Sequence, residues 1–91
     1  MEFEYRPHDW GDGYIDQEWF FGIYKIHRIE EHPDNKHRPT YHAYFKPYGW
    51  KNWGNRVAVN VPFYQTLEEA QTACAKHAER WPDRPYENDR F

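Results

Sequence analysis

Aromatic and β-branched residues concentrate in three stretches of the chain, and each stretch predicts a β-strand. The stretches are residues 19–29 (WFFGIYKIHRI), 40–48 (TYHAYFKPY) and 56–61 (RVAVNV). Both alternating faces of the first strand are partly apolar, so the pattern alone does not decide which face is buried. In the third strand the alternation directs the valines toward the core, and these are Val57, Val59 and Val61.

The four residues TLEE, which begin at Thr66, form a capping box and predict the start of a helix. The Thr66 side chain can accept a hydrogen bond from the backbone N–H of Glu69, whose carboxylate can reach back to the Thr66 N–H. Small and apolar residues then recur at helical spacing as far as Pro82, which cannot continue a helix. We expect a helix over about residues 67–80, with one stripe against a sheet: Leu67, Ala70, Cys74, His77, Ala78 and Trp81.

Polar segments divide the chain into three parts. Residues 1–18 form an acidic N-terminal arm or short strand, in which Gly11-Asp12-Gly13 predicts a turn. Residues 19–81 hold the predicted strands and helix, with Pro33-Asp34-Asn35 as the turn between the first two strands. Residues 82–91 form a polar C-terminal tail.

These elements predict an α+β domain. We expect a small antiparallel sheet of three to four strands, with one C-terminal α-helix (about residues 67–80) packed on one face. A chain of 91 residues is long enough for one such domain. The other face of the sheet would then be open, and a short edge strand leaves both a monomer and a homodimer as alternatives.

Composition adds aromatic surface and an uneven charge to this picture. Five Trp, eight Tyr and six Phe supply apolar area to a core and to contact surfaces. The net charge is −3, but residues 1–18 hold six acids and one base. With one cysteine and no long apolar stretch, we expect a cytoplasmic protein, of the producing cell or of a host cell, with no membrane contact.

Candidate catalytic and metal-binding groups are sparse. The chain contains no serine, and Cys74 lies on the apolar stripe of the helix, where a thiol stays protonated. His27 and His42 could share a zinc ion only if adjacent strands bring them together. The acids around Gly11 lack the ligand alternation of a calcium loop. We therefore expect no enzymatic activity, no cofactor and no bound metal.

Aromatic and basic residues define the candidate partner-binding surface. If the helix covers the valine face, the opposite face of the sheet gathers Tyr24, Arg28, His42, Tyr44 and Lys46. This mixture is typical of protein-binding hot spots and also of surfaces that stack nucleic-acid bases. A glycine-bounded loop adds three further candidates: Trp50, Lys51 and Trp53. Its two indoles either close the end of the core or form a contact knob.

The junction between the last strand and the helix carries a family resemblance. Three strands followed by a capped helix, with FYQTLEEA at Phe63–Ala70, resemble AP2-type and integrase arm-type DNA-binding modules. The likeness covers about residues 19–81. It implies that the open sheet face meets DNA while the helix braces the back, and so gives sheet-mediated DNA or RNA binding as an alternative function.

The chain is also similar in kind to small phage-encoded inhibitors of bacterial defence systems, anti-CRISPR proteins among them. The likeness lies in one compact domain with many aromatic residues, mixed charge and no catalytic set. It implies a non-catalytic protein-binding module that blocks a host defence complex sterically. The acidic N-terminal segment would complement a basic, nucleic-acid-handling surface of that complex. We expect protein binding as the first function.

Overall fold

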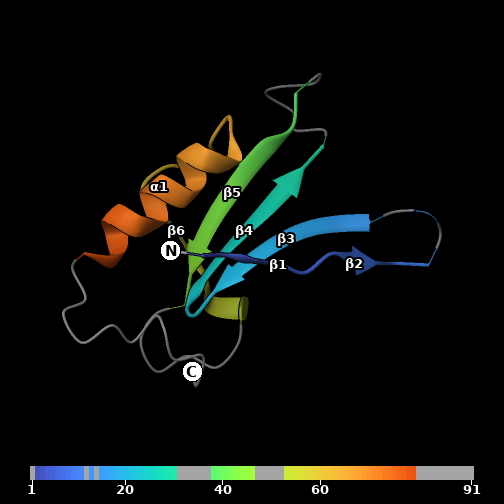
Figure 1. Cartoon of the computed structure of the whole chain (residues 1–91), viewed down its shortest axis with the longest axis horizontal. Helices are drawn as coiled ribbons and strands as arrows, with labels where there is room; N and C mark the ends of the chain where they lie inside the picture. The colour runs from blue at the N-terminus through green and yellow to red at the C-terminus, as the bar shows by residue number, and fades with distance from the viewer. Residues whose placement is uncertain (1, 12, 14, 31–37, 47–52, 80–91) are drawn as a thin grey trace.

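The computed structural model describes residues 2–11, 13, 15–30, 38–46 and 53–79 (Figure 1). In these parts of the chain, six antiparallel strands form one sheet, and a single α-helix follows them. The elements are β1 (Glu4–Tyr5), β2 (His8–Asp9), β3 (Ile15–Phe21), β4 (Tyr24–Ile29), β5 (Thr40–Phe45), the 3₁₀ turn η1 (Trp53–Asn55), β6 (Val57–Ala58) and α1 (Leu67–Ala78).

The strand order is β1-β3-β4-β5-β6, and β2 pairs with the start of β3. The predicted α+β class is therefore confirmed, but the sheet is larger than the three to four strands expected. The extra strands come mainly from the N-terminal segment, whose two-residue strands β1 and β2 both pair with β3. Within the described residues, no helix reaches the length and apolar character that a membrane crossing requires.

A tight turn at Gly22-Ile23 divides the stretch that was predicted to be one strand. Phe21 pairs with Tyr24, so two residues join β3 to β4. Gly22 has φ 54°, a conformation that two-residue hairpin turns commonly place on glycine because it has no Cβ. The prediction of one continuous strand over residues 19–29 is therefore wrong.

The turn changes which side chains share a face. Alternation restarts after it, so the odd-numbered residues of β3 lie on the same side as the even-numbered residues of β4. The side covered by α1 carries Trp19, Phe21, Tyr24, Ile26, Tyr41, Ala43 and Phe45. The opposite side, called the open face below, carries Asp16, Glu18, Phe20, Lys25, His27, His42 and Tyr44.

The outer edge of β5 is covered by a strand shorter than predicted. Val57 and Ala58 pair with β5, and Val59 donates from its N–H to the Ala43 carbonyl at 2.9 Å. Asn60 then adopts a left-handed backbone conformation, with φ 65°, which interrupts the alternation. Val59 is fully buried while Val57 and Val61 are 45% and 43% exposed, so the prediction that all three valines face the core is wrong.

The helix begins as the capping box predicts. The Thr66 hydroxyl accepts a hydrogen bond from the Glu69 N–H at 3.1 Å. The buried residues of α1 are mostly small, and they pack over β5 and β4: Ala70, Ala73, Cys74, His77 and Ala78 (Figure 1). Small side chains let the helix approach a sheet whose own side chains are large.

One buried polar contact joins the helix to the middle of the sheet. The hydroxyl of Tyr24, whose side chain is fully buried, lies 2.8 Å from Nδ1 of His77. The ring of Phe45 packs against the same imidazole, with centroids 4.4 Å apart. Because both polar groups leave water on folding, this hydrogen bond fixes the position of the last turns of α1 over β4.

The ends of the chain fit their predictions in part. Residues that were predicted to be an arm or short strand form β1 and β2, and Gly11 and Gly13 both have φ 89° between β2 and β3, as a glycine turn requires. The predicted turn at residues 33–35, Trp81 and the tail at residues 82–91 lie outside the described residues.

Replacing Tyr24 with Phe tests the buried contact. Tyr24→Phe removes the hydroxyl next to His77, and we expect it to lower the free energy of unfolding by about 1–2 kcal/mol. Tyr5→Phe, at a side chain that is 48% exposed, is the matched control and should change it by less than about 0.5 kcal/mol. Urea denaturation measures both, and equal effects would contradict the assignment of Tyr24 to the core.

Candidate functional site

The open face contains a depression of about 390 Å³. It extends across β2, β3, β4 and β5; the first two residues of β3 pair with β2, and β3 pairs with β4 from Gln17 onward. The side chains that line it are His8, Trp10, Asp16, Glu18, Lys25, His27, Tyr44 and Arg56. They come from four strands and from the residues next to β2 and β6.

One end of the depression is built by β2, β3 and the exposed side chain of Trp10. The indole is 62% exposed, and its Nε1–H donates to Asp16 Oδ2 at 2.7 Å. The imidazole of His8 packs against it at 4.4 Å between centroids. Asp16 Oδ1 also lies 3.3 Å from His27 Nε2, so this carboxylate connects the β2–β3 hairpin to β4.

The other end of the depression is basic and aromatic. The guanidinium of Arg56 lies over the ring of Tyr44, 4.9 Å from its centroid. Lys25 forms an ion pair with Glu18 in the middle of the face, and both side chains are less than one-fifth exposed. The two carboxylates and the two permanent cations that line the depression balance each other: Glu18 and Lys25 form a pair, whereas Asp16 lies beside Trp10 and Arg56 lies over Tyr44.

A row of alternating cations and rings continues from the depression toward β1 and η1. The cationic group of Arg6 is 5.0 Å from the Phe20 centroid, and that of Lys25 is 5.7 Å from Phe20 and from Trp53. Lys46 lies 4.9 Å from the Trp53 ring. At the end of the row, a hydrogen bond and charge attraction from Arg6 lower the pKa of Glu4 below its ordinary value.

The structure does not bring all eight predicted partner-binding residues together. Tyr24 is fully buried under α1, and Arg28 lies on the same side of the sheet as Tyr24. The prediction that these two share a surface with His42 and Tyr44 is therefore wrong. The error has a physical cause: the register between β4 and β5 pairs Tyr24 with Phe45 and Lys25 with Tyr44, so the opposite set of β4 side chains shares a face with Tyr44.

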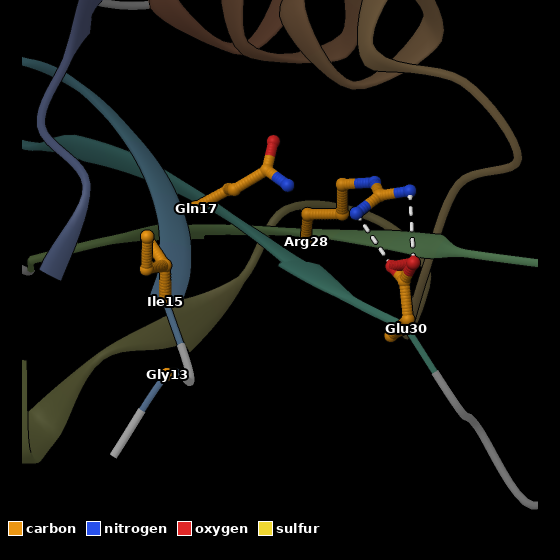
Figure 2. Close-up of a pocket in the computed structure, with 5 residues that line it drawn as sticks. All are labelled: Gly13, Ile15, Gln17, Arg28 and Glu30. Carbon is orange, nitrogen blue, oxygen red and sulfur yellow. Dashed lines mark hydrogen bonds and ion pairs between the residues drawn. The ribbon is translucent and has the colours of Figure 1, made fainter. Parts of the chain in front are cut away.

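Arg28 borders a second, smaller depression of about 290 Å³ on the α1 side of the sheet. Figure 2 shows its guanidinium turned toward the carboxylate of Glu30, with contacts of 2.5 and 3.4 Å. Gly13, Ile15 and Gln17 complete the lining. Because Glu30 already neutralises the guanidinium, this depression is a poor place for an anionic ligand.

Four predicted residues do lie on or beside the open face. Tyr44 is half-buried and lines the depression, whereas His42 is only 7% exposed and has Nε2 at 3.0 Å from the Thr40 hydroxyl. Lys46 is 4% exposed, and Trp53 is half-buried with its ring 6.0 Å from that of Phe20. Trp50 and Lys51 lie outside the described residues.

Sequence reasoning missed most of the side chains that line the depression. They are His8, Trp10, Asp16, Glu18, Lys25, His27 and Arg56. The glycine within the run Phe21-Gly22-Ile23-Tyr24 is a signal that could have revealed the hairpin, since a Gly-X pair joins many two-residue turns. No pattern signal marks Trp10, whose exposure depends on where the β2–β3 hairpin ends.

The geometry also bears on metal binding. The register places His27 opposite His42, as a zinc site between the strands would require. Their Nε2 atoms, however, contact Asp16 and Thr40 respectively. Among the residues that the structure describes, no three His, Cys, Asp or Glu side chains are grouped so that they could hold a metal ion.

Comparison with known proteins adds no relative. No family model, curated protein or solved structure matches the chain. The resemblance to AP2-type and integrase arm-type modules, and the likeness to phage-encoded inhibitors, therefore stay predictions.

The thiol of Cys74 should be unreactive in the folded protein. Burial raises its pKa to about 12, so it carries about a thousandfold less thiolate than an ordinary cysteine near pH 8. A thiol reagent should label the native chain at least about 100-fold more slowly than the urea-unfolded chain. The control is Cys74→Ala with Ala75→Cys, an exposed neighbour on the same helix that should react rapidly. Rapid labelling of native Cys74 would show that the thiol is accessible.

Proposed function

We propose that this chain is a non-catalytic protein-binding domain, which docks through the open face and blocks its partner sterically. The observation that carries the proposal is the depression on that face, where balanced charges surround the 62% exposed indole of Trp10. Tryptophan is enriched at protein–protein interfaces relative to the rest of the protein surface. Tryptophan, tyrosine and arginine are also the residues that most often dominate protein–protein binding energy.

The charge pattern favours a protein over a nucleic acid as the partner. A nucleic-acid surface gains most of its affinity from Lys and Arg that neutralise phosphates. Here the charge of Lys25 is paired with that of Glu18, and the negative charge of Asp16 would repel a phosphate backbone that binds to this face. A protein partner can instead match both signs of charge across the same face.

The acidic end of the face supports a partner with a basic surface. Between Pro7 and Glu18 the sequence contains four acids and no Lys or Arg, and two of these acids, Asp16 and Glu18, lie on the open face. Proteins that handle nucleic acid carry such basic surfaces. We therefore propose a nucleic-acid-handling complex as the partner, which is also what the likeness to phage-encoded defence inhibitors implies.

A second candidate function, sheet-mediated DNA or RNA binding, is supported by one observation. The row of Arg6, Phe20, Lys25, Trp53 and Lys46 alternates cations with rings that bases could stack on. Its weakness as a nucleic-acid surface is the burial of Lys46 and the carboxylates beside Arg6 and Lys25.

Affinity capture with the whole tagged chain tests the proposal. The double variant Tyr44→Ala, Arg56→Ala truncates the basic and aromatic end of the depression. Loss of two hot-spot side chains should weaken retention of the captured partner at least about tenfold. The control, Tyr5→Ala with Arg38→Ala, removes the same residue types elsewhere on exposed positions and should retain the partner. Circular dichroism checks that both variants fold.

The two candidate functions predict different outcomes. Capture of a protein that survives nuclease treatment, and that the open-face variant loses, supports the protein-binding domain. Equal retention by the open-face variant and the control contradicts it. Retention of nucleic acid alone, with an affinity that falls steeply as salt rises, supports the second candidate instead.

A further inference from the structure

We propose that the acidic end of the open-face depression is a site for an arginine side chain of the protein partner. The site, called the cation site below, consists of Trp10, Asp16 and Glu18. This inference rests on the proposed function and names the group that the partner must present. It concerns the end of the depression opposite to Tyr44 and Arg56.

The indole of Trp10 supplies the surface for the cation. It is 62% exposed, and its one polar atom, Nε1, is directed to Asp16 by a hydrogen bond of 2.7 Å. The ring therefore lies beside a carboxylate in a defined orientation. A cation held over an indole face is attracted by the ring quadrupole, and Trp is the side chain that gives the strongest attraction of this kind.

Asp16 supplies the negative charge of the site, and Glu18 offsets the positive charge of Lys25, which would otherwise repel a cation. Asp16 and Glu18 are two residues apart on β3, so both project from the open face. Their side chains are 15% and 16% exposed, which weakens screening by salt and water. Each is held in place by a neighbour on β4, since His27 contacts Asp16 and Lys25 contacts Glu18.

The combination favours arginine over lysine. A guanidinium is planar, can stack on an indole and can donate two parallel hydrogen bonds to one carboxylate, whereas an ammonium is a compact, strongly hydrated charge. At the other end of the depression, Arg56 would repel a second positive group. The cation site therefore accepts one arginine, with an acidic neighbour on the partner directed toward Arg56.

The indole N–H of Trp10 provides a direct readout by nuclear magnetic resonance. The probe is the peptide acetyl-Gly-Gly-Arg-Gly-Gly-amide, added to the whole chain, and Trp10→Phe assigns the indole signal. We expect a saturable shift of that signal. The same peptide with citrulline, which keeps the shape of arginine without its charge, should bind at least about tenfold more weakly, and the lysine peptide should fall between them.

Variants that remove one negative charge test whether Asp16 and Glu18 contribute to binding of the arginine peptide. Asp16→Asn keeps an oxygen that can accept from the Trp10 indole, and should weaken binding of the arginine peptide about tenfold. Glu18→Gln is a second variant, which keeps the test valid if Asn at position 16 disturbs the fold. Glu68→Gln, with the same change of net charge on an exposed residue of α1, should bind the peptide as the unaltered chain does.

The inference is overturned if the arginine peptide causes no saturable shift, if citrulline binds equally well, or if both carboxylate variants bind unchanged. These failures are distinguishable from failure of the proposed function. If Tyr44→Ala with Arg56→Ala still abolishes partner capture, the protein-binding domain stands and only the cation site is wrong. If partner capture is insensitive to the open face while the peptide binds, the cation site stands without the proposed function.

Discussion

The register of the β3–β4 hairpin decides which side chains of this sheet meet the helix and which meet solvent. A turn of two residues, with Gly22 in a left-handed conformation, pairs Phe21 with Tyr24. Because side chains alternate along a strand, a slip by one residue would exchange the two faces. Tyr24 would then leave the core, and Lys25 would enter it without a polar partner, at a high free-energy cost.

The helix covers one face of the sheet and leaves the other face exposed to solvent. Its inward side consists mostly of alanine and cysteine, so the volume of the core is supplied by the sheet, chiefly by Tyr24, Ile26 and Phe45. The open face consequently keeps the charged and aromatic side chains that pair with each other across strands. These cross-strand contacts, such as Lys25 with Glu18 and Arg56 with Tyr44, hold the side chains in place before any partner arrives.

Local signals in the sequence predicted the positions of the helix and strands better than they predicted which side chains share a face of the sheet. The capping box at Thr66 locates the start of α1, and the alternation over residues 40–48 locates β5. The hairpin at Gly22 was missed because Trp19, Phe20 and Phe21 place apolar side chains on both faces before the turn, so the change in alternation at Gly22 is difficult to recognise in the pattern. The candidate site depended on those faces, and Trp10 reaches it through a two-residue strand too short for any pattern to reveal.

Two-dimensional nuclear Overhauser spectroscopy of the isotopically labelled chain tests the hairpin register most directly. The hairpin register predicts cross-strand contacts between the backbones of Phe20 and Lys25 and of Glu18 and His27, and the covered face predicts contacts from the Tyr24 ring to His77. A continuous strand over residues 19–29, with the Tyr24 ring near Tyr44 and distant from His77, would contradict the division into a helix-covered face and an open face.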